Sequence, residues 1–579
     1  SAPAENGFWV YFMNKVFPNK YYAMYSAGPA VARIKLYEID PEKHAPAIQR
    51  PHGLPQRVLM FDWERQADHE PADLVKYAKL MGYSAISPLI LKWATANYAD
   101  PLDGYVSVNI DARNYWVRRF YDAAKGEHAE PAVPGKESVH VRYLAATKRY
   151  GLEYIPRVEW GGSQDLPREA WAIDVNGQPT KPNRFHTWGA NLLNPLTWDD
   201  LKKLMDHLVQ PYAKDNPQLA GVLWRIRSSR MPISYGPADL QLFSRETSTP
   251  LPPGGEAQWA AWAAGVMKAK YDDWWHRKRA QFHARLVELL RGYRPDLALY
   301  YFNWDSDKFG LIEPDITAWA FVKNVVKPAP EGGRAAYEKE RQARKTFTDE
   351  DYIHVMRTGN FGHAFGDLNR ADLGIRPELY KEIPGIRIFA PANYLCYADK
   401  PDYLNYFRTA DGLAMSNPVS YDEIGSRAIN PKYEGNMITP ASSAFSMALE
   451  LLAYFHGDAR TITYTVYTYG RGFADAHRRF AQAFLALPAI PGDVVDQPDR
   501  DLKVRLYPSD KGTYVGIAHK GYAGKTLTVR IPGRWKKGAT VTDLVANKAV
   551  PAAQTDDALE FELHTGPMAL HAYRIDPPR

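Results

Sequence analysis

Short apolar runs alternate with longer amphipathic segments through most of this chain, and this alternation limits its possible folds more than any other feature. The first apolar run, Val58–Trp63, reads as a buried strand with polar residues at its end. A helix is predicted from Pro71 to about Met81, where Gly82 stops it. The same strand-then-helix pattern continues for about 430 residues and predicts an α/β fold with a parallel sheet covered by helices.

The later strand candidates outnumber the places that a closed barrel offers. A (β/α)8 TIM barrel is favoured over a doubly wound sheet, because no Gly-x-Gly-x-x-Gly turn follows an early strand and polar or aromatic residues end several strands. We therefore expect two of the nine later candidates to lie in loops. The candidates are residues 84–88, 152–160, 219–226, 297–302, 316–321, 352–356, 386–390, 413–416 and 461–467. Helices are expected at 139–150, at 256–292 as one or two, and at about 441–455.

Two further segments flank the predicted barrel. Residues 1–52 are aromatic and β-prone, which predicts a strand-rich N-terminal extension, and residues 53–495 form the catalytic barrel. From about residue 496 the apolar residues alternate at period two, as in Leu527–Ile531 and Leu559–Leu563. This pattern predicts a C-terminal antiparallel β-sandwich over residues 496–579.

Composition excludes several classes of function. No run approaches the ~20 apolar residues of a membrane span, so no membrane insertion is expected. The net charge of +6 is mild for 579 residues and is spread along the chain, which does not indicate nucleic acid. Cys396 is the single cysteine, His354 and His363 are not at metal-ligand spacing, and we expect neither a metal nor a cofactor. The small residues at the start favour a secreted or periplasmic bacterial protein, and the oligomeric state stays open.

Carboxylates follow several predicted strands, and some stand next to tryptophan. In an α/β barrel the catalytic residues lie at the carboxyl ends of the strands. Glycosidic cleavage needs one acid, one nucleophilic or basic carboxylate, and aromatic faces that hold the sugar rings. We expect Trp63, Trp160 and Trp304 to line the groove. The catalytic candidates are Glu159, Asp305, Glu423 and Glu434, and Glu64 is expected to bind substrate. The other carboxylates that follow predicted strands are Asp62, Asp307 and Asp422.

Three arginines end the fourth predicted strand. Arg225, Arg227 and Arg230 could bind a carboxylate or sulfate of an acidic substrate through their guanidinium groups. Alternatively they pair with the acidic candidates and keep them ionised.

A distant resemblance appears on these residues. The stretch Ser234–Phe243, the tryptophan-rich helix after it and the strand ending Asn303–Asp305 resemble glycoside hydrolase family 42 β-galactosidases and related clan A barrels. Residues 542–545 and the last strand resemble the sandwich that accompanies glycosidase barrels. Such enzymes carry an Asn-Glu acid/base after strand four, where this chain has Arg227-Ser228-Ser229-Arg230, so that acid is not carried over.

The resemblance implies a glutamate nucleophile after strand seven. Glu423 is the best positional match and Glu434 the second, and Tyr421 could hydrogen-bond that carboxylate. The acid would be Asp305 or Glu159, each beside a tryptophan that would raise its pKa and keep it protonated.

The sequence therefore predicts a metal-free glycoside hydrolase acting on a poly- or oligosaccharide, with carbohydrate as its partner. Two alternatives stay open. One is a non-catalytic carbohydrate-binding barrel. The other is a lyase on uronic-acid polymers that uses Tyr464, Tyr467, Tyr469 and Arg471.

Overall fold

The computed structural model describes most of the predicted elements. The described residues are 40–63, 70–91, 121–122, 127–128, 139–158, 160–162, 166–179, 189–225, 231–302, 376–392, 402–410, 412–418, 447–463 and 474–576. The chain divides into two compact units, Ser1–His44 and Ala45–Arg579. In the first unit the structure describes one short helix, α1 (Pro41–His44), and most of the predicted N-terminal extension lies outside the described residues.

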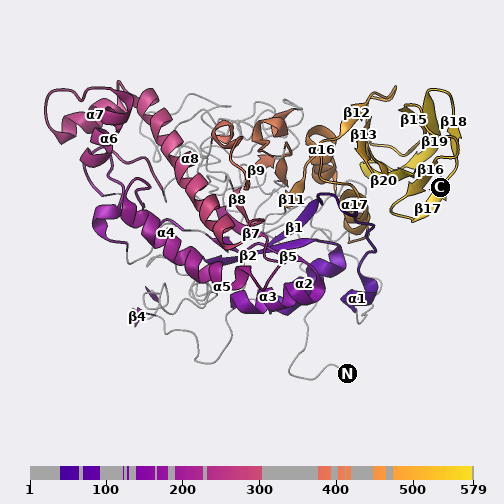
Figure 1. Cartoon of the computed structure of the whole chain (residues 1–579), viewed down its shortest axis with the longest axis horizontal. Coiled ribbons are helices and arrows are strands. Elements are labelled where there is room, and N and C mark those ends of the chain that lie inside the picture. The colour runs from indigo at the N-terminus through magenta and orange to yellow at the C-terminus, as the bar shows by residue number, and fades with distance from the viewer. Residues whose placement is uncertain are drawn as a thin grey trace, which may run out of the picture. The chain divides into compact units, whose positions relative to one another are not determined.

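The second unit contains a closed ring of parallel strands. Several of these strands are labelled beside α8 in Figure 1. Its strands are β1 (Val58–Trp63), β2 (Ala85–Leu91), β5 (Glu153–Tyr154) with β6 (Arg157–Val158), β7 (Gly221–Arg225), β8 (Ala298–Phe302), β9 (Ile386–Ala392), β10 (Met415–Pro418) and β11 (Thr461–Thr463). Neighbours in the chain are neighbours in the sheet, and β1 pairs with both β2 and β11, which closes the ring. Because β5 and β6 share one place beside β2, the ring has the eight places of a (β/α)8 barrel, and the predicted fold class is confirmed.

Helices follow the strands, as the alternation predicts. They are α2 (Pro71–Met81), α3 (Val139–Tyr150), α4 (Pro195–Leu208), α5 (Gln210–Ala213), α6 (Pro237–Thr247), α7 (Glu256–Ala264), α8 (Lys268–Tyr293), α16 (Ala448–Gly457) and α17 (Ala474–Ala486). Three 3-10 helices are described, η5 (Arg168–Ala170), η8 (Pro377–Tyr380) and η9 (Tyr403–Phe407), with a two-stranded ribbon of β3 (Tyr121–Asp122) and β4 (Glu127–His128). No described helix has the length and apolar character that a membrane span requires.

Seven of the nine later strand candidates form barrel strands. The other two, residues 316–321 and 352–356, lie outside the described residues. The ring is complete without them, so β9, β10 and β11 take the sixth, seventh and eighth places.

Glycines shape two local features of the barrel. Gly82 ends α2 in a left-handed conformation, with φ of 87°, and its N–H is donated to the carbonyls of Ala78 and Lys79. Gly221 begins β7 with φ of 148°, and a Cβ there would lie 1.9 Å from the carbonyl oxygen of Ala298 on β8. A side chain at position 221 would therefore push apart the fourth and fifth strands.

Alternation along the strands separates an outer apolar layer from the lumen. The outer faces of the strands pack with the helices in one large core that includes Phe61, Tyr154, Trp224 and Tyr301. Consecutive strand residues face opposite sides, so Arg157, Leu223, Tyr300 and Arg387, which follow one another across the pairing register, belong to the lumen.

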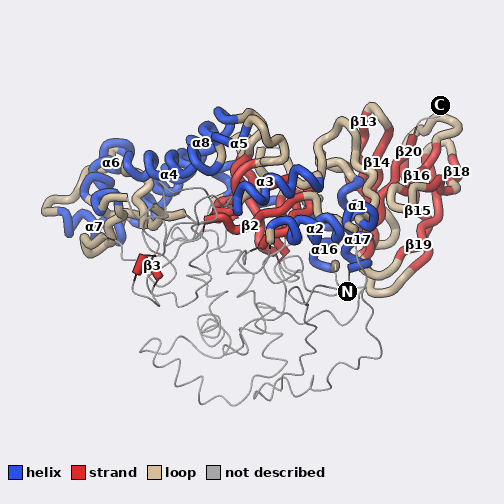
Figure 2. The backbone as a smooth tube through the Cα atoms, turned by 90° about the horizontal axis from the view of Figure 1, so that it is seen from below, coloured by secondary structure: helices blue, strands red, loops and turns tan. Residues whose placement is uncertain are grey.

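The C-terminal region is an antiparallel sandwich, as predicted. One sheet has the order β12 (Asp493–Val495), β13 (Leu502–Ser509), β14 (Gly512–His519), β20 (Ala569–Asp576), β16 (Thr540–Asp543) and β17 (Lys548–Val550). The other consists of β15 (Lys525–Pro532), β19 (Ala558–Thr565) and β18 (Ala552–Gln554). Apolar residues of both sheets form a separate core, and the larger sheet packs against α16 and α17 (Figure 2).

A buried ion pair joins the first strand, the last strand and the sandwich. Arg57, just before β1, donates to Asp458 Oδ1 at 2.6 Å and to the carbonyl of Ala459 at 2.5 Å. The hydroxyl of Tyr507 on β13 donates to the same carboxylate oxygen at 2.7 Å. Burial alone would raise the pKa of Asp458, but the charges of Arg57 and Arg505 and these hydrogen bonds lower it below its usual 3.8.

We expect Asp458→Asn to destabilise the protein by about 3–5 kcal/mol, because Arg57 would keep a buried charge without its counter-ion. A carboxylate whose pKa is lowered by folding stabilises the protein above pH 3.8, and that contribution is lost as the pH falls through the folded-state pKa. The difference in melting temperature between wild type and variant should therefore close in acid. Asp296→Asn is the control, because it alters an ion pair whose carboxylate is 69% exposed. A constant difference down to about pH 2 would contradict this account.

Candidate functional site

The closed ring brings the carboxyl ends of all eight strands to one end of the barrel. In the chain, Glu159 directly follows β6, Asp305 comes soon after β8, and Glu423 comes soon after β10, the seventh strand. The predicted acidic and basic candidates therefore follow strands one, three, four, five and seven. Of these site residues, Glu64, Glu159, Arg227, Arg230, Trp304, Asp305, Tyr421, Glu423 and Glu434 lie outside the described residues.

Two other predicted residues are placed by their backbones. Trp63 is the last residue of β1 and pairs with Pro88 of β2, while Arg225 ends β7 and pairs with Phe302 of β8. Both positions are at the carboxyl ends of their strands, where the sequence places the site.

Trp160 belongs to the barrel wall. Its side chain is 0% exposed, and its indole N–H donates to Asp200 Oδ2 of α4 at 3.2 Å. Its ring meets that of Trp224 edge-on, with centroids 5.9 Å apart, and its carbonyl accepts the Trp224 indole N–H. Trp160 has no exposed face for a sugar ring, so the prediction that it lines the groove is wrong.

Arg157 is a lumen residue that the analysis of motifs did not single out. It lies on β6 between Leu89 of β2 and Leu223 of β7, and is only 2% exposed. A buried guanidinium requires negatively charged or polar partners, since transferring a charge away from water is costly. An arginine inside a strand, on the face opposite an apolar neighbour such as Val158, is the sequence signal that could have revealed it.

A second polar group occupies the lumen near the start of the strands. Arg387 donates to the Tyr300 hydroxyl at 2.5 Å, and its guanidinium lies 5.1 Å from the centroid of that ring. Burial raises the pKa of Glu153, opposed by the charges of Arg387, Arg50 and Arg460. Glu153 begins β5, so this cluster is at the opposite end from the predicted site and has the position of a structural plug.

The stretch that carries the family resemblance connects the loops after strands three and four. The Ser234 hydroxyl accepts the backbone N–H of Ile173 at 3.0 Å, and Asp239 accepts from the Asn191 side chain at 2.9 Å. Burial raises the pKa of Asp239, partly offset by the hydrogen bonds from Ser234 and Asn191. These hydrogen bonds therefore hold the segment after strand four against the segment after strand three.

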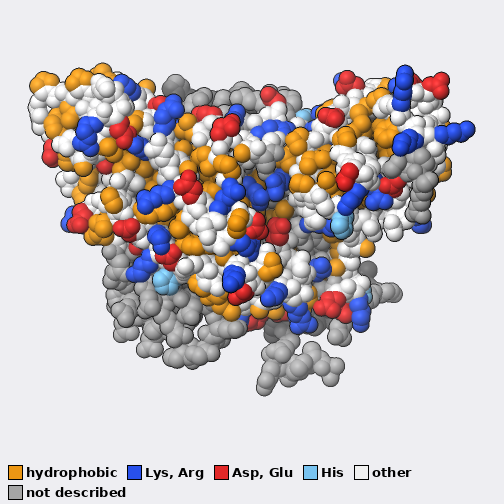
Figure 3. Space-filling model, viewed as in Figure 1, with side chains coloured by type: hydrophobic (Ala, Val, Ile, Leu, Met, Phe, Trp, Pro, Cys, Tyr) orange, Lys and Arg blue, Asp and Glu red, His pale blue; other side chains and the backbone are white. Residues whose placement is uncertain are grey.

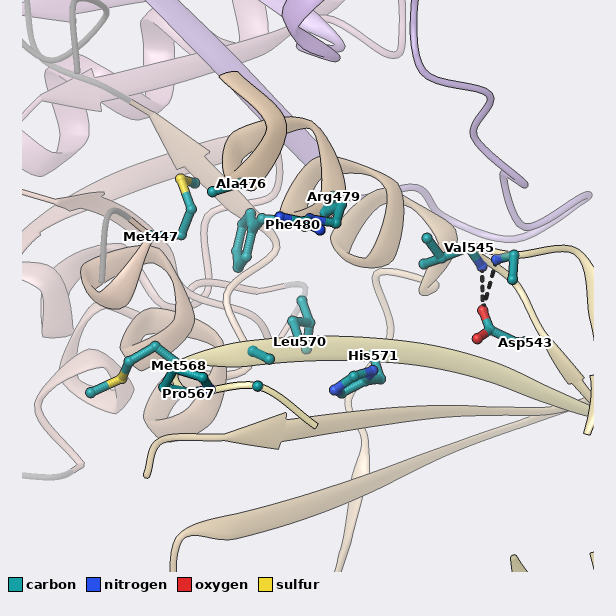
Figure 4. Close-up of a pocket in the computed structure, with 13 residues that line it drawn as sticks. Met447, Ala476, Arg479, Phe480, Asp543, Val545, Pro567, Met568, Leu570 and His571 are labelled. Atoms are coloured by element: carbon teal, nitrogen blue, oxygen red, sulfur yellow. Dashed lines mark hydrogen bonds between the residues drawn. The ribbon is translucent and has the colours of Figure 1, made fainter. Parts of the chain in front are cut away.

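A hollow among the described residues lies elsewhere, between α17 and the sandwich (Figure 4). It encloses about 430 Å³ and is largely apolar, with Met447, Phe480, Met568 and Leu570 on its walls. Its carboxylate, Asp543, accepts the backbone N–H groups of Val545 and Ala546 at 2.8 and 2.9 Å. This cleft has no second carboxylate among its described lining residues, so it is not suited to a two-carboxylate mechanism.

Charges on the described surface are mixed. On the face shown in Figure 3, Lys and Arg side chains are interspersed with Asp and Glu. Within the described ranges, no group of three or more His, Cys, Asp or Glu residues could hold a metal ion.

Comparisons with known proteins give distant structural similarity alone. No known protein family and no curated protein matches the sequence. An α-amylase from Geobacillus thermoleovorans, in complex with acarbose, is 12% identical, covers 90% of this chain and 99% of its own, and has a TM-score of 0.42. A putative α-N-acetylgalactosaminidase from Bacillus halodurans is 11% identical over 92% of this chain and 100% of its own, with a TM-score of 0.38. A GH30 endoxylanase from Clostridium papyrosolvens has 11% identity over 90% and 98%, with a TM-score of 0.32.

These similar structures are glycoside hydrolases by their descriptions, and family 42 is not among those named here. At such low scores they add no weight to the assignment of the fold. That assignment rests on the strand order and pairing of the barrel itself.

We expect Trp160→Phe to lower the free energy of unfolding by about 1–3 kcal/mol, through loss of the Asp200 hydrogen bond and of buried indole surface. Trp259→Phe, at a half-buried indole that donates to the carbonyl of Pro252, should cost less. Urea unfolding of both variants measures the difference. Equal stability of Trp160→Phe and wild type would show that the indole is not part of the wall.

Proposed function

We propose that this protein is a glycoside hydrolase that cleaves a poly- or oligosaccharide at the carboxyl end of its barrel. The observation that supports the proposal is the closed parallel ring, after whose third, fifth and seventh strands the chain places Glu159, Asp305 and Glu423. Three carboxylates that follow alternate strands of one ring come from the end of the barrel at which TIM-barrel catalysis occurs.

In the proposed mechanism Glu423 is the nucleophile or base, with Glu434 as the second choice. Asp305 or Glu159 protonates the leaving oxygen, and the oxocarbenium-like transition state forms between the two carboxylates. A separation of about 5 Å would give retention of configuration, and one of about 6.5–9.5 Å would give inversion. Trp63 and Trp304 would offer ring faces to the sugars, with Glu64 as a hydrogen-bond acceptor for their hydroxyls.

Arg157 has a supporting role in this proposal. A guanidinium buried in the lumen favours the ionised form of a nearby carboxylate and lowers its pKa. We propose that it keeps a carboxylate at the strand ends ionised, as a nucleophile or base must be.

The arginines after strand four give the proposed substrate class. Arg225, Arg227 and Arg230 would bind a carboxylate or sulfate on the sugar, so an acidic saccharide is proposed. Polymers of this kind are too large to enter a cell intact, which accords with a secreted or periplasmic bacterial enzyme.

Glu423→Gln should lower turnover by several orders of magnitude and leave substrate binding and folding largely intact, because the attacking group contributes little to uniform binding. Turnover and binding are measured separately, by steady-state kinetics and by calorimetry. Glu434→Gln is the matched control, since it removes a carboxylate from the same part of the sequence. If Glu423→Gln retains turnover within about tenfold of wild type and Glu434→Gln does not, the nucleophile is Glu434.

The acid is identified by its leaving-group dependence. Replacing the true acid should slow substrates with poor leaving groups far more than activated aryl glycosides, which need little protonation. Asp305→Asn and Glu159→Gln are compared on both substrate types. A uniform effect of both substitutions would exclude both residues as the acid.

Arg157→Met should move the acidic limb of the pH profile of kcat/KM upward by about one unit or more, because the carboxylate loses a cation that favours its ionised form. Arg157→Lys keeps the charge and should leave the limb nearly in place. Arg387→Met removes a lumen arginine on the Tyr300 side and should not move it. Reduced activity of Arg157→Met with an unshifted limb would mean that Arg157 only supports the fold.

A further inference from the structure

Two lysines of the sandwich stand over one aromatic ring of the barrel. The ammonium nitrogens of Lys503 on β13 and Lys520, just after β14, lie 4.6 and 5.0 Å from the centroid of Phe455 on α16. Phe455 itself is only 4% exposed, and both lysines are half-buried. The phenyl ring of Phe455 therefore holds the two ammonium groups close to each other at the surface.

Asp501 lies beside this cluster, since its carbonyl accepts the backbone N–H of Lys520, but no ion pair of its carboxylate with either lysine is found in the described part of the chain. The buried guanidinium of Arg505 donates an N–H to the carbonyl of Phe455. Asp458, a carboxylate that interacts with Arg505, already accepts hydrogen bonds from Arg57 and Tyr507. Burial, together with the charges of Arg505 and Lys520, lowers the pKa of Lys503. The three positive charges therefore repel one another, and an anion bound between them would reduce that repulsion.

The surroundings indicate which kind of anion fits. The two lysines share one aromatic ring, so they offer a compact pair of charges, whereas a nucleic-acid backbone is bound along an extended basic surface. Two residues beyond Lys520 in the chain, Tyr522 leaves 79% of its surface exposed, and an exposed aromatic face suits a sugar ring. A carboxylate or sulfate carried by a sugar satisfies both features.

We propose that Lys503 and Lys520 form a surface site for the carboxylate or sulfate groups of an acidic polysaccharide. The site is distinct from the proposed catalytic end, because Phe455 is near the end of α16, which leads into the start of β11. A long polyanion held there would keep the protein on its polymer between cleavage events. Binding at this site does not require hydrolysis, so the binding proposal can be tested independently of the proposed catalysis.

The test is affinity electrophoresis of the full chain in gels containing polygalacturonate or heparin, with neutral dextran as the reference polymer. The double variant Lys503→Gln/Lys520→Gln should lose at least about tenfold in affinity for the acidic polymer that binds wild type. The matched control is Lys536→Gln/Lys537→Gln, which removes the same charge from two exposed lysines of the sandwich. That control should retain nearly full affinity.

Three outcomes would overturn the proposal. They are equal losses in the two double variants, unchanged affinity in Lys503→Gln/Lys520→Gln, and a wild-type protein that binds neither acidic polymer. Lys503→Arg/Lys520→Arg keeps both charges and should bind like wild type. Matching melting temperatures confirm that any loss is not caused by unfolding, and Lys503→Gln alone serves if the double variant does not fold.

Discussion

The ion pair between Arg57 and Asp458 is the contact on which the closed barrel most depends. It lies where the first strand meets the last, the seam at which a parallel ring either closes or opens. The same guanidinium donates to the Ala459 carbonyl and to Tyr507, so one side chain ties β1, the segment before β11, and the sandwich together. A single buried charge that needs all three partners couples the closure of the barrel to the docking of the C-terminal region.

Ring closure in turn creates the end of the barrel at which we propose that catalysis occurs. Eight parallel strands in chain order place every strand-to-helix connection at one end of the barrel, where the carboxylates and arginines of the sequence follow their strands. At the other end, Arg387 donates to the Tyr300 hydroxyl in the lumen, and the charge of Arg387 acts on Glu153. The barrel thus separates a plugged end from an end that is rich in candidate catalytic groups.

Much of this fold follows from sequence patterns, because strand and helix periodicities are local properties. The helix bounds of α2 and α3, the barrel strands and the period-two strands of the sandwich were all readable in this way. The orientation of Trp160 was not foreseen, because proximity to a carboxylate in sequence says nothing about which face a residue occupies. Trp160 lies two residues beyond the end of β6 and packs with Val158 and Trp224 in the outer apolar core. Arg157 was not predicted, because a lone arginine within an apolar strand matches no motif. Its position in the lumen becomes apparent only when the strands close into a barrel.

The central claim is that water is added across a glycosidic bond at the carboxyl end of the barrel. The most direct measurement is digestion of a panel of acidic and neutral polysaccharides in ¹⁸O-labelled water, read by mass spectrometry. Hydrolysis predicts products in which each cleavage incorporates the label. Unsaturated products without label would instead show a lyase, and intact chains bound by the protein would show a barrel that only binds carbohydrate.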